Sequence, residues 1–250
     1  MKNNLLVIGC GGSIGSELVK YFCKNYNIIG ISSSEVADKK NYVQLYEEID
    51  IRNISLFNSV CCDICSKFET ISGIIYASGI TLPGSIKEIS IDDWNNSIDI
   101  NLRGYWLTFK FLYDVIIRSK TSIVQINSKT GKKGSFKNSA YSASKFAGIG
   151  LTQSMALEFA ETGVRVNAVC AGNVFESKTW SDPKKGLFVQ YAKTQNSTPE
   201  KIKQKYIDLV PMKRSCKYLD IINLVEFLLS EKSSYMTGQS INVTGGQQLF

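Results

Sequence analysis

The chain has 250 residues, of which 44% are hydrophobic and 20% are charged, and its formal net charge is +7. This composition is ordinary for a globular protein, and the length suffices for one sizeable core, so we expect a single domain over residues 1–250. No run of 18 apolar residues occurs, and the apolar stretch near the N-terminus is too short for a signal peptide. We therefore expect a cytoplasmic protein without a membrane partner.

The lysines are scattered along the chain rather than gathered in a tail or a stripe. A small anionic ligand explains the positive charge at least as well as nucleic acid does, and we expect no nucleic-acid partner. Seven cysteines include a CxxC at 62–65, but the chain has no histidine and no second ligand pair for zinc. We expect reduced thiols, partly buried on a helix, and no metal site.

Predicted strands and helices alternate from the N-terminus onward. The first half reads as a strand at 5–9, a helix at 14–25, a strand at 28–32, a weaker strand within 42–49, a helix at 54–65 and a strand at 73–76. The second half continues with a helix at 94–119, a strand at 122–127, a helix at 138–161, a strand at 165–170, a helix at 219–230 and a strand at 240–243. Asn138 or Ser139 is available as N-cap of the helix at 138–161, and Gly163 as its stop. This alternation predicts an α/β fold with a doubly wound parallel sheet of the Rossmann type.

One long segment interrupts the alternation. Residues 173–210 are polar, rich in lysine and only weakly periodic. Loops of this length in a compact domain are usually functional, and this one follows the end of a strand, where open α/β sheets bind ligands. We expect the segment to cover the substrate.

A glycine-rich loop, GCGGSIG at 9–15, lies between the first strand and the first helix. Glycines permit a tight turn and a close approach of the backbone to a pyrophosphate, and the following helix N-terminus offers N–H donors and a positive dipole end. In this setting the loop favours dinucleotide binding over a plain tight turn.

A tyrosine and a lysine stand four residues apart in YSASK at 141–145, and Ser128 precedes the tyrosine by 13 residues. On a helix, Tyr141 and Lys145 share a face, and a neighbouring ammonium favours the phenolate and lowers its pKa. In a chain without histidine, this pair is the best candidate to exchange a proton near neutral pH.

In this order, the loop at 9–15, Asn101, Ser128, Tyr141 and Lys145 resemble a short-chain dehydrogenase/reductase over essentially the whole chain. The resemblance implies an NAD(P)-dependent enzyme. Tyr141 would exchange the substrate proton, and Ser128 would hold the same oxygen. Lys145 would lower the pKa of Tyr141 and bind the nicotinamide ribose, and Asn101 would position a water that links Lys145 to solvent.

The resemblance also implies the residues that bind the cofactor. They are Gly9, Ser13, Ile14, Gly15, Ser32, Ser33, Asp50, Ile51, Ala77, Gly79, Tyr141, Lys145, Gly172 and Val174. The chain departs from the family pattern at Ile8 and Ser13 in the loop, at Tyr76-Ala-Ser-Gly79 where the family has N-N-A-G, and at Ala171 where it has proline. Asp50 would face the adenine, although a solvated loop aspartate is an equal alternative.

The preference between NAD and NADP stays open. An acid at the end of the second strand binds the ribose hydroxyls and repels a 2′-phosphate. Here that place reads Ser32-Ser-Ser-Glu35, in which Glu35 argues for NAD, while Lys39 and Lys40 would serve NADP.

The second half is similar to a subgroup, the sorbitol-6-phosphate 2-dehydrogenases, on QINSKTG at 125–131, VPMKR at 210–214 and TGQSINVTGGQ at 237–247. This subgroup interconverts sorbitol 6-phosphate and fructose 6-phosphate. A phosphorylated sugar or polyol needs cations near the catalytic oxygen, and Lys129 and Arg214 are the candidates.

Two other functions remain open from the sequence. One is a ketoreductase of another polar substrate, such as a precursor of a surface sugar. The other is a dinucleotide-sensing regulatory or scaffold protein without turnover. The family commonly forms homodimers or homotetramers through the helices near Trp94 and Asn138, so we expect a homo-oligomer.

Overall fold

The computed structural model describes residues 2–34 and 39–250, and Glu35 lies outside this part of the chain. Seven parallel strands form one sheet in the order β3-β2-β1-β4-β5-β6-β7. The strands are β1 (Asn3–Ile8), β2 (Tyr26–Ser32), β3 (Leu45–Glu48), β4 (Gly73–Tyr76), β5 (Ser122–Ser128), β6 (Arg165–Ala171) and β7 (Ser240–Val243). The predicted doubly wound sheet is confirmed.

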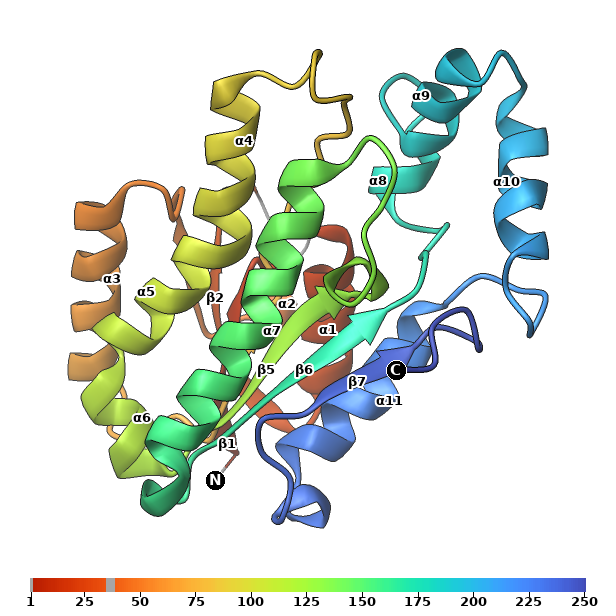
Figure 1. Ribbon diagram of the computed structural model, residues 1–250. Coiled ribbons are helices and arrows are strands. Elements are labelled where there is room, and N and C mark those ends of the chain that lie inside the picture. The colour runs from red at the N-terminus through yellow and green to blue at the C-terminus, as the bar shows by residue number, and fades with distance from the viewer. Residues whose placement is uncertain (1, 35–38) are drawn as a thin grey trace.

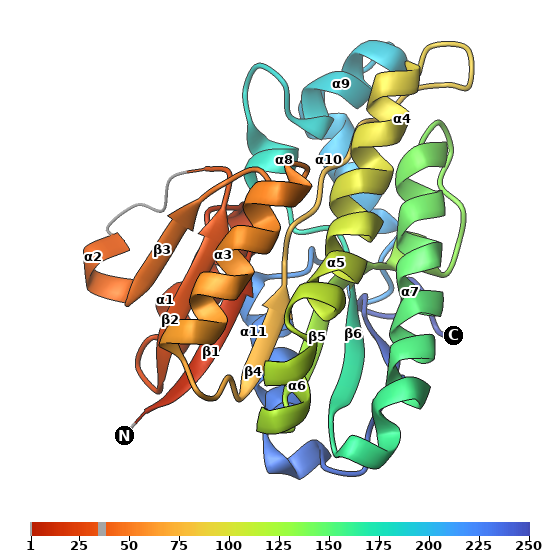
Figure 2. The ribbon, with the colours of Figure 1, turned by 90° about the vertical axis from the view of Figure 1, so that its left-hand side faces the viewer.

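Two apolar layers sandwich the sheet because successive side chains of a strand point to opposite faces. Leu6 and Ile8 of β1 belong to one core cluster, whereas Leu5 and Val7 belong to the other. The first face is covered by α3 (Ile54–Lys67), α5 (Gly104–Phe111), α6 (Tyr113–Ser119) and α7 (Ser139–Phe159), which lie together in Figure 2. The second face is covered by α1 (Ser13–Phe22) and α11 (Tyr218–Leu229), behind the sheet in Figure 1.

The helix predicted at 94–119 is not continuous. It begins earlier, as α4 (Ile91–Ile98), because the Ser90 side chain caps its N-terminus. A π-helical stretch at Asp99–Arg103 then inserts extra backbone, and the helix breaks at Leu112, whose φ of −107° and ψ of 14° are not helical. The π-helical stretch contains Asn101, and such stretches occur frequently at functional sites.

Residues 173–210 form helices, which corrects the expectation of a long loop. They contain α8 (Lys178–Ser181), α9 (Leu187–Thr194) and α10 (Pro199–Asp208). The three helices share a small apolar core that contains Phe175, Trp180, Phe188 and Ile202. The segment is therefore packed around these side chains despite its many lysines. We call residues 173–210 the cap, and Figure 1 shows it above the carboxyl ends of β5 and β6.

The third strand is shorter than predicted, because Tyr42 ends the short helix α2 (Lys39–Tyr42) and pairing with β2 begins at Leu45. Gly163 ends the α7 region in a left-handed conformation with φ of +81°, as predicted. All seven cysteines are free thiols. None of the described helices is both long and apolar enough to cross a membrane.

Candidate active site

Ser128, Tyr141 and Lys145 line one cavity of about 190 Å³ at the carboxyl ends of the strands. Ser128 is the last residue of β5, and Tyr141 and Lys145 lie one turn apart near the N-terminus of α7. The Tyr141 hydroxyl is hydrogen-bonded to the side chains of Ser128 and Thr81. The three side chains that the sequence separates by up to 17 residues therefore meet at one point.

Lys145 is 4% exposed, and burial lowers the pKa of its ammonium from 10.5 to about 8. Its Nζ donates to the carbonyl oxygen of Ile126 at 3.0 Å and lies 5.7 Å from the centroid of the Tyr141 ring. The carbonyl of Lys145 accepts from Asn127 Nδ2 at 3.1 Å, so β5 fixes both ends of this residue.

The expected lowering of the Tyr141 pKa by Lys145 is not what the structure shows. Burial raises the pKa of Tyr141, and the hydrogen bonds to Ser128 and Thr81 only partly oppose that rise. The physical reason is geometric, since the ammonium faces a strand carbonyl and the phenol ring rather than the phenol oxygen. Further positive charge beside Tyr141 would lower this pKa.

Asn101 is fully buried in the π-helical stretch. Its Oδ1 accepts from the Ile80 amide at 2.8 Å, and its Nδ2 donates to the Ile80 carbonyl at 3.0 Å and to Ser144 Oγ at 2.9 Å. Ser144 in turn donates to the Tyr141 carbonyl at 2.8 Å. The side chain therefore ties the β4–α4 loop to α7.

The glycine loop has the geometry that a pyrophosphate needs. Gly9 has φ of +89°, and a Cβ at Gly15 would fall on the Gly9 carbonyl. No side chain caps the N-terminus of α1 and no acidic residue lies in its first turn, so its N–H groups and positive dipole end are available to an anion. Ser13 Oγ accepts from the Lys178 amide at 3.2 Å, which joins the loop to the cap.

A second cavity continues from the first along the sheet edge, and Ala77 and Gly79 line both. It is lined by Ser32, Ser33, Asp50 and Ile51, which are the residues expected on the adenosine side, and by Gly9 of the glycine loop. Ser32 is buried and its Oγ accepts from the Ser34 amide at 3.3 Å, while Ser33 is exposed. No carboxylate stands at the end of β2 among the described residues.

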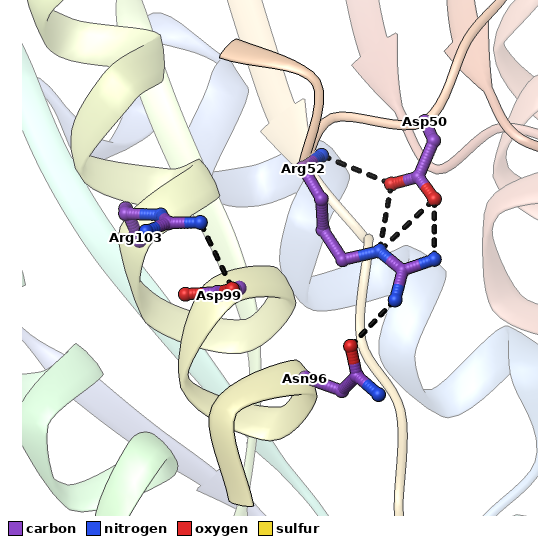
Figure 3. Close-up of polar contacts among 5 residues, drawn as sticks. All are labelled: Asp50, Arg52, Asn96, Asp99 and Arg103. Atoms are coloured by element: carbon purple, nitrogen blue, oxygen red, sulfur yellow. Dashed lines mark hydrogen bonds and ion pairs between the residues drawn. The ribbon is translucent and has the colours of Figure 1, made fainter. Parts of the chain in front are cut away.

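Asp50 belongs to a polar cluster at the rim of this second cavity. Arg52 donates to both of its carboxylate oxygens and also to Asn96 of α4, as Figure 3 shows. The hydrogen bonds and charge of Arg52 hold the pKa of Asp50 below its ordinary value. The Asp50 carboxylate accepts four hydrogen bonds from the amide and guanidinium of Arg52, which is about the number that a carboxylate can accept. This arrangement favours the alternative of a loop aspartate over an adenine ligand.

The remaining expected residues lie between the two halves of the site. Gly172 follows β6 and donates from its amide to the Val243 carbonyl at 2.9 Å. Ile14, Gly172 and Val174 line the catalytic cavity. A Cβ at Gly79 would come within 3.4 Å of both Lys145 Nζ and Asn101 Oδ1, so this glycine keeps the space beside the lysine open.

These features fit a dinucleotide. The loop and α1 would hold its pyrophosphate, Lys145 and the open space at Gly79 would hold the nicotinamide ribose, and the second cavity would take the adenosine. No group of three or more metal-binding side chains is found in the described part of the chain.

Sequence reasoning missed the wall of the cavity that faces Tyr141. Trp180, Tyr191 and Tyr206 of the cap line it, and the Tyr191 and Tyr206 rings stack with centroids 5.9 Å apart. Thr81, which bonds Tyr141, was also missed. The aromatic residues at 175–191 were the available signal, because Phe188 and Tyr191 lie three residues apart, a helical spacing.

The two expected phosphate ligands are separated. Lys129 lines the catalytic cavity, where burial lowers the pKa of its ammonium from 10.5 to about 8. Arg214 instead lines a different cavity near the C-terminus and is ion-paired with Asp220. The structure therefore does not bring Arg214 to Ser128, and its neutralisation by Asp220 is the physical reason to exclude it from the site.

The chain matches the short chain dehydrogenase family over residues 3–185. It is 43% identical to sorbitol-6-phosphate 2-dehydrogenase of Escherichia coli over 185 residues, which cover 73% of this chain and 70% of that protein. The crystal structure of sorbitol-6-phosphate 2-dehydrogenase SrlD from Erwinia amylovora superposes with a TM-score of 0.91 at 36% identity, covering 98% of this chain and 100% of that one. An NAD⁺-bound xylitol dehydrogenase superposes with a TM-score of 0.86 at 25% identity, covering 98% of each chain. The chain therefore belongs to the short-chain dehydrogenase family and is an NAD(P)-dependent oxidoreductase.

Proposed function

We propose that this enzyme interconverts sorbitol 6-phosphate and fructose 6-phosphate. The observation that carries the proposal is Lys129, a partly buried ammonium in the catalytic cavity, directly after Ser128 in the chain. In the described part of the chain no carboxylate forms an ion pair with Lys129. The positive charge of its neighbour Lys133 lowers the pKa of the Lys129 ammonium further. A cation placed in this way is stabilised by an anionic ligand. The 43% identity to a sorbitol-6-phosphate 2-dehydrogenase supports a phosphate ester as that anion.

The cavity also suits a polyol chain. Ser128, Thr81, Ser135 and Asn138 supply hydroxyl and amide groups, and the cap supplies the aromatic wall of Trp180, Tyr191 and Tyr206. Asn138 is 5% exposed and its Oδ1 has no hydrogen-bond partner within the described residues. Such a buried acceptor favours a ligand rich in hydroxyl donors.

In the oxidising direction, Ser128 would donate a hydrogen bond to the reacting oxygen, and Tyr141 would take the hydroxyl proton. An oxidised nicotinamide in this cavity would supply the hydride acceptor and would add a positive charge. Together with the hydrogen bonds of Ser128 and Thr81, that charge would oppose the burial that raises the pKa of Tyr141. The proton would leave Tyr141 past Lys145, and the reverse reaction uses the same groups in the opposite order.

We also propose that the enzyme is a homo-oligomer. Exposed apolar side chains gather on the helices of one face, with Trp94 on α4, Trp106 on α5, and Phe146 and Leu157 on α7. These helices lie side by side in both ribbon views (Figures 1 and 2). Apolar patches of this kind are typical of protein–protein contacts.

A panel of sugar and polyol phosphates, each assayed with NAD and NADP, tests the proposed substrate. We expect sorbitol 6-phosphate to have the highest kcat/KM. The kcat/KM of unphosphorylated sorbitol should be at least about tenfold lower, because sorbitol lacks the phosphate that would contact Lys129. The Lys129→Ala variant should raise the KM for sorbitol 6-phosphate and leave that for sorbitol nearly unchanged. Higher activity on an unphosphorylated keto substrate would instead identify a ketoreductase of another polar compound.

A further inference from the structure

Lys129 owes its position to the C-terminal end of the chain. Its Nζ donates to the side-chain Oε1 of Gln247 at 2.7 Å, a contact that spans 118 residues of sequence. Lys129 sits in the short 3-10 turn Lys129–Gly131 that follows β5, so its side chain would otherwise be free to turn toward solvent. Gln247 is the one hydrogen-bond acceptor recorded for this ammonium in the described part of the chain.

A double-glycine turn places Gln247 at that point. Gly245 and Gly246 have φ of +61° and +86°, a region that side chains rarely adopt, and the Gln247 amide donates to the Thr244 carbonyl at 3.2 Å. The Gly245 carbonyl accepts from the Met212 amide at 3.1 Å, just beyond the end of the cap. The turn is therefore held by the segment that follows the cap rather than being a loose terminus.

The chemistry of this contact is selective for anions. An amide oxygen holds an ammonium without neutralising it, whereas a carboxylate in the same place would cancel its charge. Within the described residues the Gln247 side chain hydrogen-bonds only through its Oε1, so an oxyanion beside the ammonium can accept a hydrogen bond from its Nε2. An oxyanion reaching this corner would meet a full positive charge and a neutral donor together.

We propose that Gln247 is a specificity-determining residue, which holds the Lys129 ammonium in the catalytic cavity and forms with it the subsite for the phosphate of the substrate. This inference rests on the proposed function and extends it, because it assigns the second group of the subsite to the C-terminal segment.

Gln247→Glu is the most selective test. It keeps the size of the side chain but neutralises Lys129 and repels a phosphate, so the KM for sorbitol 6-phosphate should rise by about tenfold to a hundredfold. The KM for unphosphorylated sorbitol and the KM for the cofactor should change by less than about twofold. Gln247→Leu, which leaves the charge of Lys129 in place, should have a smaller effect than Gln247→Glu.

Gln248→Glu is the matched control, because it makes the same charge change one residue later. The Gln248 side chain donates to the Phe250 carbonyl and lines the other cavity, so its substitution should leave both KM values nearly unchanged. Equal effects of the two glutamates, or an equal rise in KM for sorbitol and its phosphate in Gln247→Glu, would overturn the inference while sparing the proposed substrate.

A second readout does not depend on turnover. Acetylation of Lys129 by acetic anhydride, followed by peptide mass spectrometry, should be slowed by inorganic phosphate in the parent enzyme and in Gln248→Glu but not in Gln247→Glu. If the parent enzyme fails on every sugar phosphate, the proposed function is wrong, and protection of Lys129 by phosphate would still support the subsite. Absence of protection in the parent enzyme would overturn it.

Discussion

Lys145 is required for catalysis in this account, but its charge destabilises the fold. The fall of its pKa from 10.5 to about 8 means that burying the ammonium costs roughly 3 kcal/mol relative to the unfolded chain. Replacing Lys145 by methionine removes this penalty and also removes the hydrogen bond to the Ile126 carbonyl, which contributes about 1 kcal/mol. Lys145→Met should therefore raise the free energy of unfolding by about 2 kcal/mol at pH 7 while activity is lost.

The sign of the pH dependence follows from the direction of the shift. Because the folded pKa lies below the unfolded one, the penalty is fully present below about pH 8 and disappears as the pH rises toward 10.5. The stability advantage of Lys145→Met should thus shrink by about 2 kcal/mol between pH 7 and pH 9.5, to near zero. Groups that do not interact with Lys145 contribute equally to both proteins and cancel in the difference.

Urea unfolding followed by circular dichroism at several pH values measures this difference, with Lys110→Met on the exposed side of α5 as a control for loss of a surface lysine. A variant that is less stable than the parent at pH 7, or a difference that does not change with pH, would refute the reasoning that burial of Lys145 opposes folding.

Three further changes have defined outcomes. Gly15→Ala places a methyl group on the backbone carbonyl of the loop and should weaken cofactor binding by about tenfold or more in a fluorescence titration, whereas Gly150→Ala, whose Cβ would meet nothing within 4 Å, should not. Ser33→Asp puts a carboxylate at the end of β2 and should shift the ratio of kcat/KM for NAD over NADP upward by about tenfold, and an unchanged ratio would show that the 2′-position lies elsewhere. Leu157→Asp, on the apolar face of α7, should lower the oligomeric mass in light scattering, and the same change at the fully exposed Tyr235 should not.

The sheet was predictable because its signals are local. Continuous apolar runs such as that of β1 are buried on both faces, and their alternation with helices leaves few topologies open. The catalytic residues were predictable for a related reason, since Tyr141 and Lys145 lie one turn apart on a single helix. In such cases the spacing in the sequence determines the spacing in the fold.

Other parts of the site depend on contacts that no local pattern records. The cap was expected as a loop because its lysines mask the small core around Trp180 and Phe188. The direction of the Tyr141 pKa depends on burial and on where the Lys145 ammonium points, which spacing alone does not determine. Gln247 reaches Lys129 only because the sheet brings the C-terminal turn beside the end of β5, a contact across 118 residues.

The central claim is that Tyr141 exchanges a proton while a hydride moves between C2 of sorbitol 6-phosphate and the nicotinamide. Sorbitol 6-phosphate deuterated at C2, incubated with the enzyme and either oxidised cofactor, tests it when the reduced cofactor is analysed by mass spectrometry. We expect deuterium in the reduced cofactor from the parent enzyme, and a rate lower by about 10²- to 10⁴-fold from Tyr141→Phe with cofactor binding retained. Deuterium that stays in the sugar, or an unchanged rate in Tyr141→Phe, would contradict the account.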